Sequence, residues 1–269
     1  MPIRLIATDI DHTLLTSQRI PHPESVLAIK RAVASGVHVV LASGRYIPSI
    51  KGYGRDIGLI GPFIGCNGAH ICDTQGVDLS VMALDKEVTK HLLSYAQQHR
   101  VHINVYTDQS LYLCSNDRPA GQISADQSGT IKLETIRFED ALNLTVIKIM
   151  LIDEPDAVIH HQRHLTPQFR PDQTHVTTSE PEYLEFLPFN SNKGLALQKL
   201  ADHLGIHQSE TAAIGDYMND LEMIKWAGIG AAVGNATSAL KDAANVVVKS
   251  NDEGGVGEFI DSLIQNQRK

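Results

Sequence analysis

Two carboxylates at the end of a short apolar run restrict the fold of this chain more than any other feature. Residues 3–7 are mostly apolar, and Asp9 and Asp11 follow them one residue apart. Runs of this length, bounded by polar residues, are typical of a buried strand in a parallel sheet. In open α/β sheets, ligands bind just beyond the carboxyl ends of the strands. The sequence therefore predicts that Asp9 and Asp11 lie where such a sheet forms its site.

The segments that follow alternate between strand and helix. Residues 21–35 have apolar side chains at helical spacing, and Gly36 stands where a helix C-cap is expected. Strands are predicted over residues 37–42 and 62–65. Because parallel strands need crossover helices, this order predicts a doubly wound, mostly parallel, Rossmann-like α/β core. The two strands end in the polar turns Ser43-Gly44-Arg45 and Cys66-Asn67-Gly68.

From about residue 84 the pattern changes to a helix followed by two strands, and this pattern occurs twice. The first helix is expected over residues 85–99, and two strands flank a predicted hairpin turn at Asp108-Gln109-Ser110. The predicted elements are strands 102–107, 111–115, 145–152, 174–178 and 183–187, and helix 155–165. The sequence therefore predicts an inserted α+β domain over residues 84–187, and a core domain made of residues 1–83 and 188–269.

The core pattern resumes after the insertion. A helix is predicted over residues 190–204 with Lys193 in its first turn, and a strand over residues 211–214 ends in Gly215-Asp216. The remaining predicted elements are helix 219–227 and strands 230–233 and 245–248. These segments place further polar side chains, Lys193 and Asp216, at the predicted sheet edge where Asp9 lies.

Composition narrows the possible partners. The 269 residues carry a formal net charge of −8 and no basic run, which argues against a nucleic-acid partner. No apolar segment approaches the roughly 18 residues that span a bilayer, and the first residues lack the features of a secretion signal. Three cysteines are too few and too irregularly spaced for a disulfide framework or a zinc site, so buried free thiols are expected. The sequence thus predicts a cytoplasmic protein without a membrane partner, and it leaves monomer and dimer both open.

The polar groups at the predicted strand ends form a consistent chemical set. It comprises Asp9, Asp11, Ser43 with Gly44, Lys193, and Asp216 with Asn219 and Asp220. Oxygen ligands without His or Cys favour a hard cation, Mg²⁺ before Ca²⁺. A lysine, a hydroxyl and a backbone amide suit phosphoryl oxygens. An aspartate is ionised at neutral pH and can attack phosphorus, so the set points to phosphoryl chemistry.

Several short motifs then occur in a fixed order along nearly the whole chain, with the insertion between the second and third. They are DIDHTLL, SGR, NKG, GDYMND, VGNA and SNDEGGVGEFI. This series resembles the haloacid dehalogenase-like hydrolase superfamily, and within it the Cof-type phosphatases that carry a large α/β (type IIB) cap. The resemblance implies a phosphatase whose inserted domain covers the active site and excludes water.

The resemblance also implies roles for individual residues. Asp9 would be the nucleophile that forms an aspartyl-phosphate, and Asp11 would act as general acid and then as general base. Ser43 and Lys193 would complete the catalytic set by holding the phosphoryl oxygens. The Mg²⁺ ligands would be Asp9, the Asp11 carbonyl and Asp216, with Asn219 and Asp220 in or near the coordination sphere. Substrate contacts are expected from Ser43, Gly44, Asn67, Lys193 and Asn219.

One position departs from the family pattern, because His12 stands where the family usually has glycine. Glycine permits unusual backbone angles and close approach of a ligand. His12 could therefore narrow the phosphate pocket or add a donor to it, or it could be an exposed, tolerated imidazole. Both interpretations stay open at this point.

Simpler roles exist for several of these residues. Asp216 and Ser43 could each cap a helix, Lys193 could be solvated, and Asn67 with Gly68 could only form a turn. Trp226 lies in a predicted amphipathic helix and is expected to face the protein core. The clustered histidines lack a spacing that suggests a metal site and are interpreted as surface residues; they are His160, His161 and His164.

The sequence therefore predicts a Mg²⁺-dependent phosphatase acting on a small phosphorylated metabolite, such as a sugar phosphate or a phosphorylated cofactor. A phosphomutase of the same superfamily and a non-catalytic sensor of a phosphorylated ligand are the alternatives. The sequence does not name the substrate. Specificity is expected from side chains of residues 85–188 that face the site.

Overall fold

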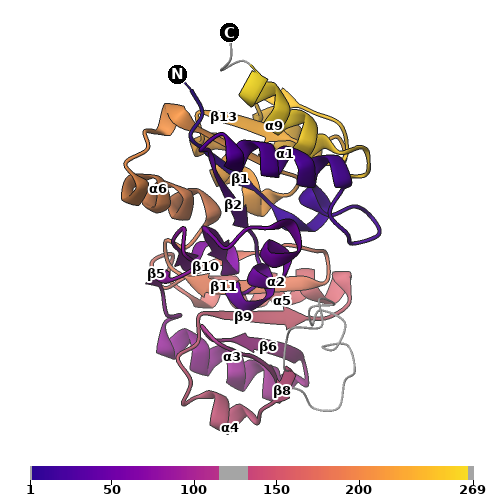
Figure 1. Cartoon of the computed structure of the whole chain (residues 1–269). Helices are drawn as coiled ribbons and strands as arrows, with labels where there is room; N and C mark the ends of the chain where they lie inside the picture. Colours follow the sequence, from indigo (N-terminus) through magenta and orange to yellow (C-terminus); the bar gives the residue numbers. More distant parts are fainter. Residues whose placement is uncertain (1, 115–132, 266–269) are drawn as a thin grey trace.

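The computed structural model describes residues 2–114 and 133–265, which form two β-sheets with helices packed on them (Figure 1). The strands of the first sheet come from both ends of the described chain, and those of the second come from its middle. Ser115, the last residue of a predicted strand, lies outside the described residues.

The first sheet has eight strands in the order β14-β13-β12-β1-β2-β3-β4-β5. Neighbours from β14 to β3 run parallel, whereas β3–β4 and β4–β5 are antiparallel. The mostly parallel α/β core predicted from the sequence is therefore confirmed. The strands are β1 (Leu5–Thr8), β2 (His38–Ala42), β3 (Phe63–Gly65), β4 (His70–Cys72), β5 (Asp78–Val81), β12 (Thr211–Gly215), β13 (Ile229–Ala232) and β14 (Val246–Val247).

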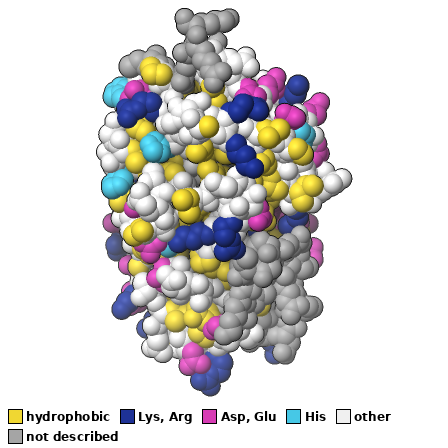
Figure 2. Space-filling model, in the orientation of Figure 1, with side chains coloured by type: hydrophobic (Ala, Val, Ile, Leu, Met, Phe, Trp, Pro, Cys, Tyr) yellow, Lys and Arg dark blue, Asp and Glu magenta, His cyan; other side chains and the backbone are white. Residues whose placement is uncertain are grey.

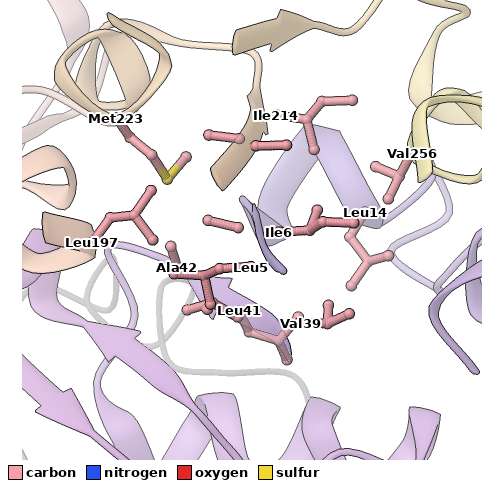
Figure 3. Packing of buried hydrophobic residues seen from close by; sticks show 14 of the residues in the cluster. Leu5, Ile6, Leu14, Val39, Leu41, Ala42, Leu197, Ile214, Met223 and Val256 are labelled. Carbon is pink, nitrogen blue, oxygen red and sulfur yellow. The ribbon is translucent and has the colours of Figure 1, made fainter. Parts of the chain in front are cut away.

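Helices cover both faces of this sheet. Figure 3 shows Leu197 and Met223 on one side of β1, and Leu14 and Val256 on the other. All four side chains are fully buried, so each face of β1 packs against an apolar layer, as a doubly wound sheet requires. The helices of this part are α1 (Pro23–Ala34), α2 (Ile47–Ile57), α6 (Lys193–Leu204), α7 (Leu221–Trp226), α8 (Ser238–Ala243) and α9 (Gly255–Gln265).

The sequence pattern does not predict helix α2, and its composition explains why. Two glycines and a proline interrupt its apolar residues, and glycine has a low helix propensity. Gly54 stands there for a packing reason, because a Cβ at this position would lie 2.8 Å from the Phe63 ring. The close approach of α2 to β3 therefore requires a residue that local propensity disfavours.

The second sheet has six strands in the order β10-β11-β9-β6-β7-β8, antiparallel except for the parallel pair β7–β8. The predicted hairpin is confirmed, since Tyr106 pairs with Leu111. The strands are β6 (His102–Tyr106), β7 (Leu111–Cys114), β8 (Leu133–Thr135), β9 (Lys148–Ile152), β10 (Thr174–Thr177) and β11 (Tyr183–Pro188), and the helices are α3 (Lys86–His99), α4 (Phe138–Ala141) and α5 (Pro155–Leu165). The predicted α+β character of the insertion is thus confirmed.

One interpretation of the histidines is wrong. His160 and His164 are exposed, but His161 is buried on the inner side of α5. Its ring lies 2.8 Å from the Tyr95 hydroxyl through Nδ1 and 3.2 Å from an Asp153 carboxylate oxygen through Nε2. Because both partners come from other elements, helical periodicity alone could not indicate this burial.

Charged side chains of both signs are interspersed on the surface. Figure 2 shows Lys and Arg among Asp and Glu over the visible face, with small groups of hydrophobic side chains between them. Among the described residues, no helix combines the length and the apolar character needed to cross a membrane. Trp226 is half-buried and packs against the core of the first sheet, in agreement with its predicted place.

Replacing Leu41 in β2 by alanine tests the importance of the layer around β1. Leu41 is fully buried, so Leu41→Ala should lower the free energy of unfolding by about 2–5 kcal/mol. Urea denaturation followed by circular dichroism measures the change. Leu27→Ala in α1 is the matched control, because Leu27 is 48% exposed, and it should change the free energy by less than about 0.5 kcal/mol. Equal losses in the two variants would contradict the described packing.

Candidate active site

A cavity of about 270 Å³ lies between the loops of the first sheet and one face of the second. Its first wall is formed by the segments that follow β1, β2 and β12, including Asp9, Asp11, Ser43, Gly44 and Asp216. Its second wall is formed by strands β6, β9 and β11 and the residues before β11, including Tyr106, Lys148, Glu180 and Glu185. Most of the predicted site residues therefore meet the insertion at one cavity, whereas Asn67, Lys193 and Asp220 are not among its lining residues.

Asp9 stands directly after β1 and is fixed by the sheet. Its backbone N–H donates to the Ile214 carbonyl of β12 at 3.0 Å, and its side chain is only 7% exposed. The carboxylate accepts a hydrogen bond from Lys193 Nζ at 2.6 Å. Lys193 itself has no exposed surface, so the alternative that it is a solvated lysine is wrong.

Three carboxylates converge around this lysine. Oxygen atoms of Asp9, Asp216 and Asp220 all lie within 4.8 Å of one another. Lys193 Nζ also donates to Asp220 at 2.6 Å, and Thr13 Oγ1 donates to Asp216 at 2.8 Å. Three of the five predicted metal ligands, from two distant segments, thus share one acidic cluster, whereas the side chains of the other two, Asp11 and Asn219, bond to Arg45 and Asn67.

This acidic cluster carries more negative charge than the lysine neutralises. Burial raises the pKa of Asp9 well above its usual range, against the opposing charge of Lys193, and Asp220 and Asp216 raise it further. Burial and the charge of Asp220 raise the pKa of Asp216 to about 7. Burial lowers the pKa of Lys193, but Asp220 and Asp9 outweigh it and the net change is upward. Crowded, oxygen-only donors of this kind fit a hard divalent cation such as Mg²⁺.

The helix-capping alternatives for Asp216 and Ser43 do not hold. The carboxylate of Asp220, not that of Asp216, accepts backbone hydrogen bonds from Asp216 and Tyr217, at 3.0 and 3.3 Å. Ser43 Oγ accepts from the backbone N–H of Arg45 at 3.2 Å, whereas α2 begins at residue 47. Both side chains therefore stand at the cavity without capping the helix that follows them.

Asp11 forms an ion pair that the sequence analysis did not anticipate. Arg45 Nε and one terminal nitrogen donate to its two oxygens at 2.7 and 2.8 Å. Burial raises the pKa of Asp11, but the hydrogen bonds and the charge of Arg45 outweigh it and lower the pKa overall. The sequence did hold a signal for Arg45, because the SGR motif places a charged residue in the turn that follows a predicted strand.

The Asn67 turn joins the two domains of the site. Asn67 adopts φ 49°, as a turn residue does, but its side chain also bridges two neighbours. Its Nδ2 donates to Glu185 at 2.6 Å, and its Oδ1 accepts from Asn219 Nδ2 at 3.1 Å. The structure therefore brings Asn67 and Asn219 together, and Glu185 is the partner that the sequence analysis missed.

A buried ion pair in the second sheet was missed as well. Lys148 and Glu185 lie 3.2 Å apart with side chains 2% and 1% exposed. Lys148 also donates to the Gly44 carbonyl at 2.7 Å and stands 4.6 Å from the centre of the Tyr106 ring. The available signal was a charged residue within each apolar strand, because such residues are rarely buried unless they are paired.

His12 fits neither of its two interpretations fully. It has φ 56°, a left-handed conformation that explains the glycine usual at this position. The ring is half-exposed, and its Nε2 lies 3.0 Å from Glu180 of the second domain. The hydrogen bond to Glu180 raises the pKa of His12 to about 9, although burial opposes it. His12 therefore lines the cavity and contacts the inserted domain there.

Comparison with known proteins agrees with the motifs. The model of the haloacid dehalogenase-like hydrolase family matches residues 6–260. The chain is 31% identical to the 5-amino-6-(5-phospho-D-ribitylamino)uracil phosphatase YwtE of Bacillus subtilis, covering 98% of this chain and 99% of that protein. The chain belongs to the haloacid dehalogenase-like hydrolases, and within them it is a phosphatase.

Solved structures show the same fold over nearly the whole chain. A haloacid dehalogenase-like hydrolase from Bacteroides thetaiotaomicron superposes with a TM-score of 0.88 at 29% identity, covering 97% of this chain and 99% of that one. The subclass IIB sugar phosphatase BT4131 superposes with a TM-score of 0.85 at 23% identity, covering 96% and 98%. The second likeness shows the fold, including the type of inserted domain predicted from the sequence.

Replacing Arg45 by glutamine tests its hold on Asp11. In Arg45→Gln the pKa of Asp11 should rise, because the arginine no longer outweighs the effect of burial, which raises this pKa. A pH titration of the Asp11 carboxyl carbon by NMR measures the change. Since Arg45 lowers the folded-state pKa, the ion pair contributes stability at neutral pH that is lost as the pH falls through that pKa. Arg55→Gln, an exposed change in the helix α2 that follows Arg45, is the control, and an equal pKa of Asp11 in both variants would refute the assignment.

A double-mutant cycle tests the buried pair in the second sheet. Lys148→Met leaves Glu185 charged and buried, so it should cost about 3–5 kcal/mol of unfolding free energy. The double variant Lys148→Met/Glu185→Gln should recover part of this loss, because no uncompensated charge remains. Urea denaturation measures each step, with exposed Lys90→Met as the control. Additive losses from the two substitutions would argue against a direct pair.

Proposed function

We propose that this phosphatase hydrolyses a phosphate monoester of a small metabolite, a sugar phosphate or a phosphorylated cofactor, through an aspartyl-phosphate on Asp9. The observation that carries the proposal is the different surroundings of two adjacent carboxylates. Asp9 lies against Lys193 in the acidic cluster, whereas Asp11 is held by Arg45 at the cavity. Two carboxylates with opposite pKa shifts suit two different tasks.

In the first step an Asp9 carboxylate oxygen attacks phosphorus and the bond to the leaving oxygen breaks, while Asp11 supplies the proton that releases the alcohol. In the second step water attacks the phosphorus of the aspartyl-phosphate, Asp11 accepts its proton, and phosphate leaves with Asp9 restored. Mg²⁺, when bound by Asp9, Asp216 and neighbouring oxygen donors, supplies positive charge that keeps these carboxylates ionised beside an anionic substrate. Lys193 adds a fixed positive charge at the same place.

Arg45 has a role in this proposal because it holds Asp11 in the ionised form. A carboxylate in a bidentate pair with arginine is a poor proton donor. A phosphoryl group also binds guanidinium in a bidentate manner. We therefore propose that Arg45 moves toward the substrate phosphoryl oxygens, beside Ser43 and the Gly44 amide, and so allows Asp11 to take up the proton it donates.

The division into domains belongs to the same proposal. Residues 84–187 would act as a cap over a core made of residues 1–83 and 188–269. The cavity of about 270 Å³ matches a small metabolite better than a macromolecule. On the cap side, Lys148, Glu185 and Ser179 offer charges and a hydroxyl beside the rings of Tyr106 and Tyr183, a suitable wall for a leaving group rich in hydroxyls. Sugar and sugar-like phosphates have leaving groups of this kind. Such compounds also appear in the names of the relative YwtE and of the structural neighbour BT4131.

The proposed compartment is the cytoplasm. All three cysteines are free and buried, as the sequence analysis expects, and none forms a disulfide. A reducing compartment keeps such thiols in this state.

Replacing Asp9 by asparagine tests the proposed reaction. Phosphate release is measured from sugar phosphates, nucleotides, pyridoxal phosphate, flavin mononucleotide and an aryl phosphate, with Mg²⁺ or with EDTA. Asp9→Asn should lower turnover by on the order of 10⁴-fold, as the loss of a covalent nucleophile does in other enzymes. EDTA should abolish turnover, and Mg²⁺ should restore it. Asp202→Asn, an exposed change in α6, is the control and should keep full activity.

Other outcomes separate the alternative functions. Undiminished phosphate release by folded Asp9→Asn would exclude the proposed nucleophile. Little net phosphate release together with dependence on a bisphosphate activator would identify a phosphomutase. Binding of a phosphorylated ligand without turnover would identify a sensor.

A further inference from the structure

A second group of metal-ligating atoms lies outside the active site, on the antiparallel edge of the first sheet. His70 and Cys72 project from the same face of β4, two residues apart. Asp78 of β5 faces Cys72, because the register changes from Ile71–Ser80 to Cys72–Asp78 at a bulge. Figure 1 shows β5 at the side of the molecule. The bulge therefore brings an imidazole, a thiol and a carboxylate together.

The three ligand atoms have separations close to those around a tetrahedral metal ion. His70 Nε2 lies 2.7 Å from Asp78 Oδ1, Cys72 Sγ lies 3.3 Å from the same oxygen, and Cys72 Sγ lies 3.9 Å from His70 Nε2. Bond lengths of about 2.0–2.3 Å in a tetrahedral zinc site place pairs of ligand atoms roughly 3.3–3.6 Å apart. Movements of about 0.6 Å or less would thus bring each pair to the required separation.

The burial and the hydrogen bonding of the three side chains also favour a metal site. The His70 side chain is 1% exposed, and its Nδ1 has no hydrogen-bond partner among the described residues, so its polar bonding is directed at Asp78 and Cys72. Cys72 has no exposed surface. The Asp78 side chain is 43% exposed, which leaves an approach from solvent and a place for water as a fourth ligand.

The charges around the group also suit a divalent cation. Besides Asp78, the charges of Asp73 and Lys51 act on the Cys72 thiol. A bound cation replaces the thiol proton, which is released to solvent. Thiolate, two carboxylates and Lys51 then sum to −2, which a divalent ion balances.

We propose that His70, Cys72 and Asp78 form a second metal site that binds a borderline divalent cation such as Zn²⁺ or Co²⁺. A nitrogen, sulfur and oxygen donor set favours these ions, whereas Mg²⁺ prefers oxygen alone. The spacing of the three cysteines predicted no zinc site, because only Cys72 contributes and its partners are a histidine and an aspartate. Bound metal would tie β5 to β4 directly before residues 82–84, where the chain enters the second sheet's domain.

Cobalt spectroscopy on the full-length protein tests this site. Co²⁺ added to the wild type should give thiolate-to-cobalt charge-transfer absorption in the near ultraviolet. The acidic cluster of Asp9, Asp216 and Asp220 offers only oxygen and cannot give this absorption, so occupancy of the active site does not interfere. Competition by Zn²⁺ then gives the zinc affinity, and no phosphatase assay is needed.

Matched variants decide the assignment. Cys72→Ser should abolish the charge-transfer band, whereas Cys114→Ser, an equally buried thiol in β7, should keep it. Asp78→Asn, a half-exposed change that preserves shape, should weaken Zn²⁺ binding by about tenfold or more while the protein stays folded. Absence of the band in the wild type, or its persistence in Cys72→Ser, would overturn the proposal. Unchanged Zn²⁺ affinity in Asp78→Asn would overturn the three-residue site.

Discussion

The burial of one lysine between two aspartates is the constraint on which the rest of the site depends. Lys193 has no exposed surface, and its ammonium group donates to Asp9 and Asp220 at 2.6 Å each. A buried charge without a partner costs several kcal/mol, so the first turn of α6 must meet the end of β1 and the turn between β12 and α7. The residues joined in this way are separated by 184 and 27 positions in the sequence. Correct packing of the whole core is therefore a condition for assembling the acidic cluster.

A second series of polar contacts links the inserted domain to this cluster. Lys148 bonds to the Gly44 carbonyl and pairs with Glu185, which accepts from Asn67, and Asn67 accepts from Asn219 beside Asp220. All but the Gly44 contact lie between side chains, and two of those side chains are charged and buried. Such a network fixes the orientation of each member because an unpaired member would be costly. These contacts thus couple the position of the inserted domain to the loops that carry the candidate catalytic residues.

Local sequence patterns predicted the parts of the fold that rest on local physics. Apolar runs ending in polar turns identified β1, β2, β3 and β12, since strands buried on both faces are apolar throughout. The same reasoning did not predict α2, whose glycines serve close packing against β3, or the short antiparallel strands β4 and β5. It also placed His161 on the surface, although Tyr95 and Asp153 bury it. These elements depend on neighbours that are distant in the chain.

The sequence by itself determined the family, the strands β1, β2, β3 and β12 that end at the site, and the carboxylates Asp9, Asp11 and Asp216 at the sheet edge. These follow from periodicity and from motifs in a fixed order. Only the tertiary structure decided which charges pair: Arg45 with Asp11, and Lys148 with Glu185. It alone also brought Asp78 to His70 and Cys72 through a bulge. The physical reason is that charged and metal-ligating side chains pair with the groups that lie near them in the folded structure. Local periodicity in the sequence contains no information on that proximity.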